Sequence, residues 1–570
     1  MKKILIGLGF ALFGLQSCDV LDVDPQSFYS ENVAYASIEN VDFYVKDLYQ
    51  AFREYADIEK PVDVYDDGFS DLLKYSWAAI APGNQVNKLF YYGQGINADR
   101  DFRNKWDQAY WHIRELNEFL VDMHNGLASG LDQEKLAVRI AEVRVIRAFV
   151  YQELVKRYGG VVLRISEEKV DDHTDRSKAR SSEAECWDFI INELDKAAKV
   201  LPEQWKDKDG INHVGRVTKG AAYGLKARAA LYAKRWQDAV DACDEVLKLE
   251  KKGVHALLGK NQYNDIFSIP NNKELLLSVN YEKMKLHHTF NLNCCPPYDY
   301  KEAGALKDFC GAAMTPTEEY ASQFDIKLNG NWQSFSWDNL SQYANGPWAD
   351  RDPRFYSSIL YNGASWINDR KLQVYVGGHD GFFDFKNDPA DDYKRSTATG
   401  YYIRKFVKND AEINFVDVQS DQFWIEMRMA EIYLIRSEAK ARLEKWGEAY
   451  IDLNKIRTRV GMPALPQQNV WDNYLVDLEK ERICELGMEG HRFFDLVRWD
   501  KAVETLNGKR LHGVKITKLP TGVFEYKVVE CDTEDRLFPK QYTISPIPTA
   551  ELVANTLCEQ SDLWLSLIHI

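Results

Sequence analysis

The sequence predicts a mainly α-helical protein in which helical hairpins carry a loop-rich insert. Two observations lead to this fold class. Four segments open with a tryptophan, and their next apolar or small residues follow at successive offsets of three, four and three, which places all four side chains on one helix face. Between residues 257 and 422 this periodicity disappears, and Gly, Asn, Pro and aromatic residues accumulate instead.

The first eighteen residues have the pattern of an export signal with a lipid attachment point. Lys2 and Lys3 precede an apolar run, Ile4 to Leu15, that is too short to span a bilayer, and Cys18 follows a small residue. A cysteine at this point is typical of bacterial lipoproteins, whose mature chain begins with the acylated cysteine. We therefore interpret residues 1–17 as a lipoprotein signal peptide and Cys18 as the lipidation site. The alternative is an ordinary signal peptide with an incidental cysteine.

Residues 18–256 are expected to form the N-terminal part of a helical scaffold. A helix is predicted from Asp132, a suitable N-cap, to the natural stop at Gly159. The segment 221–233 lies only two residues before Trp236, so the two must form an antiparallel hairpin that resembles those of tetratricopeptide repeats. The tryptophans are interpreted as packing residues, and the four segments are Trp106–Leu116, Trp187–Ala197, Trp236–Val246 and Trp446–Ile456.

Residues 423–560 are expected to complete this scaffold. The segment 426–443 precedes Trp446 by a two-residue join, which predicts a second hairpin of the same kind. Residues 561–570 depart from this pattern, and the terminal LSLIHI is interpreted as a non-native tail.

Residues 257–422 form the insert, which we interpret as the ligand-binding region. Loops of this length are usually functional or disordered, and their Trp and Tyr content argues against disorder. An aromatic ring offers an apolar face to a sugar ring while neighbouring polar groups bond its hydroxyls. The alternative is that the rings pin the loops as a small core, but two or three are expected to be exposed. The aromatics considered are Tyr75, Trp77, Tyr298, Trp332, Trp337, Tyr343, Trp348 and Trp366.

The overall charge excludes several classes of partner. A formal net charge of -15 argues against binding nucleic acid and against electrostatic adhesion to anionic lipid. Attachment to a membrane is therefore expected through the lipid anchor alone. The cysteines match no zinc pattern, although Cys294 or Cys295 could pair with Cys310.

Three glutamates, Glu481, Glu485 and Glu489, recur at steps of four and first suggest a catalytic or metal site. Carboxylates on one helix face repel each other unless they are paired or bind metal. We predict a buried ion-pair network, with arginines of the same segment as partners, namely Arg482, Arg492 and Arg498.

No cofactor or metal site is predicted elsewhere in the chain. Acidic clusters at Asp63, Asp66 and Asp67, and near Asp388, could bind calcium, but their spacing differs from that of EF-hands, so solvated loops are favoured. Nucleotide-binding and nucleophile-elbow motifs are missing from the sequence.

Eight segments, in this order, resemble the SusD/RagB family of Bacteroidetes outer-membrane lipoproteins. They are CDVLDVDP, AEVRVIRAFVYQELVKRYGGV, GRVTKGAAYGLKARAALY, RDPRF, TGYYIRKF, RMAEIYLIRSEA, ERICELGMEGHRFFDLVRW and ISPIPTAEL. The resemblance implies a SusD-like α/α superhelix with tetratricopeptide-like hairpins. It also implies a non-enzymatic protein on the outer face of the outer membrane, which captures glycans and acts as a lid on a SusC-like TonB-dependent transporter.

The resemblance also implies roles for individual residues. Asp19, Asp22 and Asp24 resemble the acidic signal that sends such lipoproteins to the cell surface. Family members often bind sugar through an arc of aromatics, for which Trp77 is the best early candidate. The predicted ligand-binding set is Tyr75, Trp77, Tyr298, Trp332, Trp337 and Tyr343.

Three other functions remain open at this point. The same import role could serve peptides instead of glycans, as in some relatives of the family. A surface glycosidase would need two carboxyl groups about 5 to 9.5 Å apart across a sugar site. A scaffold without ligand is the last possibility.

Overall fold

The computed structural model describes residues 31–59, 65–75, 95–101, 103–166, 177–206, 215–296, 311–382, 396–408, 420–532 and 534–565. The predicted signal peptide and lipidation site, the acidic signal after Cys18, and the candidates Trp77 and Tyr298 lie outside these residues. So does Cys310, so the possible disulfide is not described either.

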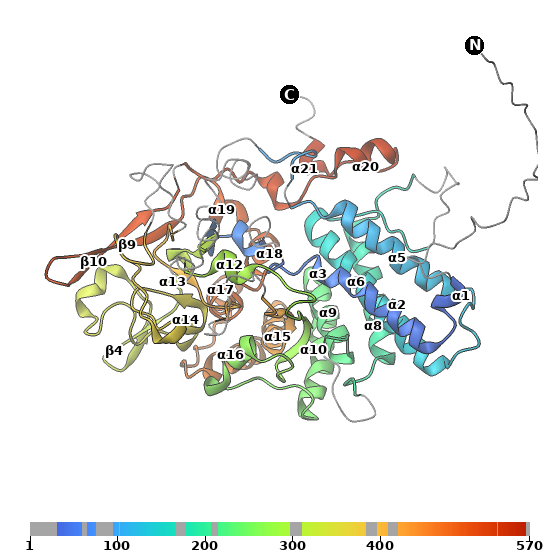
Figure 1. The fold of residues 1–570 in the computed structure, drawn as a ribbon, viewed down its shortest axis with the longest axis horizontal. Coiled ribbons are helices and arrows are strands. Elements are labelled where there is room, and N and C mark those ends of the chain that lie inside the picture. The colour runs from blue at the N-terminus through green and yellow to red at the C-terminus, as the bar shows by residue number, and fades with distance from the viewer. Residues whose placement is uncertain are drawn as a thin grey trace, which may run out of the picture.

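The N-terminal half is a layer of packed helices, drawn from blue to green in Figure 1. They are α1 (Glu31–Ala34), α2 (Ile38–Leu48), α3 (Gln50–Arg53), α5 (Trp106–His124), α6 (Gln133–Tyr158), α8 (Glu183–Val200), α9 (Lys219–Tyr232) and α10 (Trp236–Lys251). The prediction for α6 is confirmed, because the Asp132 carboxylate accepts from the amides of Glu134 and Lys135 at its start. Gly159 ends the helix with φ 70° and ψ -134°, a conformation that a side chain would disfavour.

The two predicted hairpins are present. α9 and α10 join through Lys234, and α15 (Met429–Arg442) joins α16 (Trp446–Arg459) through Glu444. Both joining residues have positive φ values, 58° and 60°, which turn the chain within a few residues. The C-terminal helices continue as α17 (Trp471–Leu486), α18 (Arg492–Arg498) and α19 (Ala502–Leu506).

The insert consists of short helices and two-stranded antiparallel sheets. The strands β2 (Leu275–Val279), β3 (Met314–Pro316), β4 (Ile326–Leu328) and β6 (Ile359–Leu360) pair in turn with β8 (Trp424–Arg428), β1 (Leu73–Tyr75), β5 (Asn331–Gln333) and β7 (Tyr402–Ile403). Between them lie α11 (Asp265–Ser268), α12 (Phe290–Cys294), α13 (Glu318–Ala321), α14 (Pro353–Ser358), and the 3₁₀ helices η3 (Lys260–Gln262), η6 (Trp337–Gln342) and η7 (Ile367–Asp369).

The C-terminal part contains strands that the sequence did not predict. Residues 424–428 form β8 before α15 begins, so the helix expected from residue 426 starts three residues later. A longer hairpin joins β9 (His512–Lys518) to β10 (Phe524–Glu530) and lies at one end of the molecule, beyond the insert (Figure 1). The chain continues through η10 (Lys540–Thr543), α20 (Thr549–Ala554) and α21 (Asp562–Leu565).

The packing role predicted for the helical tryptophans is confirmed for Trp106 and Trp187, which are 1% and 3% exposed. Trp106 packs edge-on against Tyr158, with ring centroids 5.1 Å apart. In the part of the chain that the structure describes, the helices are all too short or too polar to cross a membrane.

Candidate functional site

The first candidate aromatic of the insert that the structure describes is Trp332 on the β4–β5 hairpin. Asn329 and Gly330 form its two-residue turn with φ values of 51° and 85°, the left-handed pair that an Asn-Gly sequence favours. This turn places Trp332 directly across from Lys327, whose ammonium lies 6.0 Å from the centre of the indole. Trp332 is half-buried, and its strand neighbours Asn331 and Gln333 are exposed. Successive side chains of a strand point to opposite faces, so the indole lies on one face of this hairpin and the amides of Asn331 and Gln333 lie on the other.

The next ring along the chain, Trp337, is fixed by a buried carboxylate. Trp337 opens η6, and its indole N–H donates to the Glu318 carboxylate over 2.8 Å. The Tyr401 hydroxyl donates to the other oxygen of the same carboxylate over 2.5 Å. Burial raises the pKa of Glu318 to about 7, although the hydrogen bonds from Tyr401 and Trp337 act in the opposite direction.

A second group of buried rings packs against the loop that carries Trp337. Tyr343 stacks on Phe335 with ring centroids 5.5 Å apart, and its hydroxyl bonds both the amide and the carbonyl of Ser336. The Arg351 guanidinium lies 3.9 Å from the centre of the Phe335 ring. The same guanidinium donates to the backbone carbonyls of Ala321, Phe324 and Pro347, so it ties the loop to its base.

Tyr526, far away in the sequence, completes the cluster from β10. Its ring centroid lies 5.5 Å from that of Trp337 and 5.9 Å from that of Trp348. Trp348 is 7% exposed and packs edge-on against Trp337. The half-buried Trp337 therefore rests on a rigid aromatic base.

Comparison with known proteins assigns the family. The sequence profile of the SusD family matches residues 273–564. The chain belongs to the SusD family. A second profile, described as starch-binding associating with outer membrane, matches residues 20–231.

Individual relatives cover nearly the whole chain. SusD-like protein P25 of Formosa agariphila is 24% identical over 97% of both chains. A crystal structure of a SusD-like protein from Bacteroides fragilis NCTC 9343 superposes with a TM-score of 0.74, at 26% identity, and covers 93% of this chain and 98% of that one. A SusD-like carbohydrate-binding protein from the same strain gives a TM-score of 0.73 at 21% identity and covers 92% and 99%. These likenesses confirm the predicted family and the mainly helical, tetratricopeptide-like fold.

The described candidates divide into two groups in this SusD-family fold. Trp332 on β5 and Trp337 on η6 are both half-buried. Tyr75 and Tyr343 are buried, at 0% and 7% exposure, so neither ring faces solvent. Tyr75 lies on β1, where its hydroxyl accepts from the Tyr65 amide. Trp348 and Trp366 are also buried, as the small-core alternative expected.

Sequence reasoning missed the residues that hold the cluster. Glu318 and Tyr526 carry no local signal, because their partners lie on other segments, and Arg351 was noticed only as part of the RDPRF motif. In the sequence, Glu318 two residues after Pro316 and Tyr526 among the charged residues of β10 both resemble ordinary surface residues. Only the fold brings Tyr526 to Trp337.

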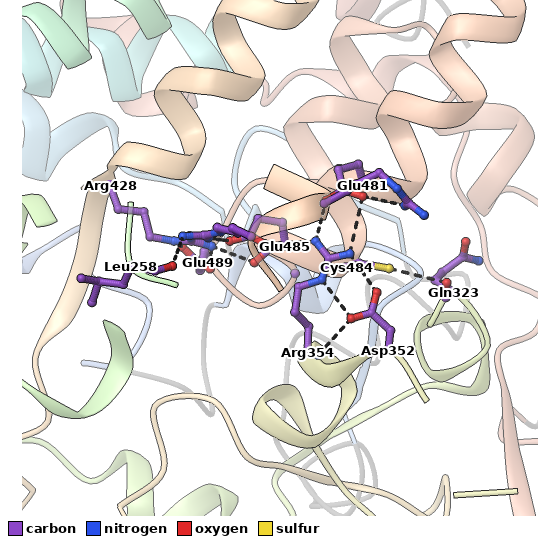
Figure 2. A network of polar contacts seen from close by, with 12 residues as sticks. Leu258, Gln323, Asp352, Arg354, Arg428, Glu481, Cys484, Glu485 and Glu489 are labelled. Atoms are coloured by element: carbon purple, nitrogen blue, oxygen red, sulfur yellow. Dashed lines mark hydrogen bonds and ion pairs between the residues drawn. The ribbon is translucent and has the colours of Figure 1, made fainter. Parts of the chain in front are cut away.

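The predicted buried ion-pair network at Glu481, Glu485 and Glu489 is confirmed, but its predicted partners are wrong. Glu481 and Glu485 have no exposed side-chain surface, and Glu489 lies beyond the end of α17. Their partners come from other segments, as Figure 2 shows in part, and are Arg354, Lys405, Arg428, Arg457 and Arg459.

The three arginines of the glutamate segment pair elsewhere. Arg482 binds Asp495, Arg492 binds Asp71, and Arg498 binds both Glu438 and Asp495. The reason is geometric, because Arg482 leaves α17 in another direction than Glu481 and Glu485, while Arg492 and Arg498 lie on the separate helix α18.

The prediction of a solvated loop at Asp66 and Asp67 is also wrong. Both are buried, and Asp66 accepts two hydrogen bonds from Arg157 while Asp67 accepts from the amides of Gly490 and Arg492. Asp63 and the cluster near Asp388 lie outside the described residues. Among the described residues no group of three or more His, Cys, Asp or Glu side chains could hold a metal ion.

Proposed function

We propose that this protein captures oligosaccharides at the cell surface and passes them to a SusC-like TonB-dependent transporter, over which it acts as a lid. The observation that carries the proposal is two half-buried indoles on neighbouring elements, Trp332 on β5 and Trp337 on η6, the second of which packs on Trp348 and Tyr526. The hairpin of Trp332 also carries Asn331 and Gln333 at exposed positions, so it supplies both the apolar and the polar groups that a sugar ring requires.

Family membership supports the same function. One matching profile is described by starch binding and outer-membrane association, and one structural neighbour of the same fold is described as carbohydrate-binding. We propose that Cys18 carries the lipid anchor and that the membrane is contacted through this anchor. Trp77 and Tyr298 remain proposed members of the binding arc, together with Trp332 and Trp337. The proposal contains no catalytic step.

The test is a binding measurement on the soluble protein lacking residues 1–18. Titration calorimetry against a panel of neutral oligosaccharides should detect at least one ligand. Trp332→Ala should weaken that binding by about tenfold, because a central aromatic contact contributes roughly 1.4 kcal/mol or more. Trp111→Ala is the matched control, since this indole is 51% exposed on α5, outside the insert.

Two outcomes would contradict the proposal. One is the lack of binding to every oligosaccharide together with the failure of the full-length protein to co-purify with a TonB-dependent transporter. The other is hydrolysis of an oligosaccharide in the panel. Peptide binding that survives Trp332→Ala would favour peptide import instead.

A further inference from the structure

The β9–β10 hairpin has one satisfied edge and one open edge. The Leu519 amide donates to the Val523 carbonyl over 2.9 Å, and the Cys531 amide donates to the Leu511 carbonyl over 2.7 Å. In an antiparallel ladder, hydrogen-bonded pairs alternate with pairs whose backbone groups point outwards. The register therefore directs the amides and carbonyls of Phe524, Tyr526 and Val528 away from β9.

Outward groups at three positions of β9 find partners. The Val514 amide donates to the Thr399 carbonyl, the Val376 amide donates to the Ile516 carbonyl, and the His512 amide donates to the Glu319 carboxylate. Nothing comparable covers β10, since no backbone partner exists for Phe524, Tyr526 or Val528 within the described ranges. β10 is thus the open edge.

A groove follows this edge over its whole length. It has a volume of about 920 Å³, and its lining includes the seven consecutive residues 524–530. Both faces of a strand can line one groove only if the groove runs beside the strand. Leu340 of η6 lies across from β10 in this groove. The hairpin is also rigid, because Tyr526 packs on Trp337 and Phe524 packs on Tyr375 with ring centroids 5.5 Å apart.

The side chains along β10 point alternately to the two faces of the hairpin. Phe524, Tyr526 and Val528 share one face, while Glu525, Lys527 and Val529 share the other. Lys527 is exposed on the second of these faces. An acidic side chain at the facing position of an added strand would pair with this ammonium group.

We propose that an extended segment of a partner protein adds to β10 as a third strand. The segment alternates apolar residues, which face Leu340 and Tyr526, with acidic residues, which face Lys527. Its backbone pairs with the outward amides and carbonyls of β10, so main-chain bonds provide affinity and the alternation provides specificity. The proposal does not depend on glycan binding.

The test uses a blocked peptide of alternating valine and glutamate, acetylated and amidated because a segment within a protein has no free termini. Fluorescence anisotropy on the soluble protein should show saturable binding. Val528→Pro should weaken it at least about fivefold, because proline removes an outward donor and spares the β9 ladder. Val528→Thr keeps that amide and should bind like the wild type.

Charge reversal supplies an independent arm. Lys527→Glu should reverse the preference, so that an alternating valine and lysine peptide binds better than the acidic one. N-methylation of every second peptide residue can block either the amides that face β10 or the amides that face away from it. Only methylation of the amides that face β10 should abolish binding.

The proposal would be overturned if neither peptide bound, or if Val528→Pro and Val528→Thr bound the acidic peptide equally. A dimer of the protein that Val528→Pro dissociates would assign the edge to a second copy instead. An oligosaccharide whose binding depends on the Val528 amide would assign it to the glycan. Oligosaccharide titration of the same variants separates this test from that of the proposed function.

Discussion

Glu318 is the residue on which the candidate site depends, because a single buried carboxylate receives both the Trp337 indole and the Tyr401 hydroxyl. Its pKa in the folded protein is about 7, above the ordinary value of 4.5. The folded state therefore binds its proton more tightly than the unfolded state does. Stability from this group is fully present below pH 4.5 and is lost as the pH rises towards 7.

Glu318→Gln should remove this dependence. Between pH 4 and pH 8 the free energy of unfolding of the wild type should fall, relative to the variant, by up to about 3 kcal/mol. Urea unfolding at several pH values measures the difference. Glu525→Gln, at an exposed position of β10, should keep the wild-type slope. An identical slope for Glu318→Gln and the wild type would contradict the argument.

At the scale of the element, the β4–β5 turn decides how Trp332 is presented. Gly330 has a φ of 85°, and a methyl group placed on it would meet no atom within 4 Å. Gly330→Ala should therefore cost about 1 kcal/mol from backbone conformation alone. Hydrogen exchange of the hairpin amides should become about fivefold faster, because the hairpin opens more often.

Gly253→Ala is the matched control, since this glycine also has a positive φ and open space but follows α10. Faster exchange in the β4–β5 hairpin of this control would show that the effect is not local. Unchanged exchange in Gly330→Ala would show that the turn does not limit the opening of the hairpin.

A helix could be predicted where the residues that mark its ends lie within the helix segment itself or next to it. Asp132 and Gly159 mark the ends of α6 in the sequence, and both marks are observed in the structure. The family motifs add the order of the segments. The strand β8 was missed because it is only five residues long and is stabilised by β2, which lies about 150 residues earlier.

The site was predictable only in part, because its geometry depends on contacts between distant segments. Sequence reasoning selected Trp332 and Trp337 by their loop context, and the structure leaves both half-buried on neighbouring elements of the insert. The same reasoning selected Tyr75 and Tyr343, which the fold buries. Composition alone does not separate an exposed ring from one that pins a loop, since both require an aromatic residue in an irregular segment.

For the whole molecule, the buried ion-pair network joins the insert to the C-terminal helices (Figure 2). Arg354 of α14 donates to Glu481 of α17 over 2.6 Å and to Asp352 over 2.8 Å, and its side chain has no exposed surface. Burial alone would raise the pKa of Glu485, but Arg459, Arg428 and Arg354 hold it well below its ordinary value. The carboxylate of Glu485 therefore remains charged and depends on these arginines.

Arg354→Met should destabilise the protein by roughly 3 to 5 kcal/mol, because it deprives buried Asp352 of its guanidinium and removes one of the two arginines that pair with Glu481. Urea unfolding followed by circular dichroism measures the loss, and adding Asp352→Asn should restore part of it by removing the carboxylate that lost its guanidinium. Arg235→Met breaks an exposed pair with Asp188 and should cost less than about 1 kcal/mol. Equal effects of the two arginine substitutions would show that the buried network does not bind the insert to the scaffold. A large loss confined to Arg354→Met would explain why a loop-rich insert can hold Trp332 and Trp337 in fixed positions, since its base is fastened to α17 by charges that water cannot screen.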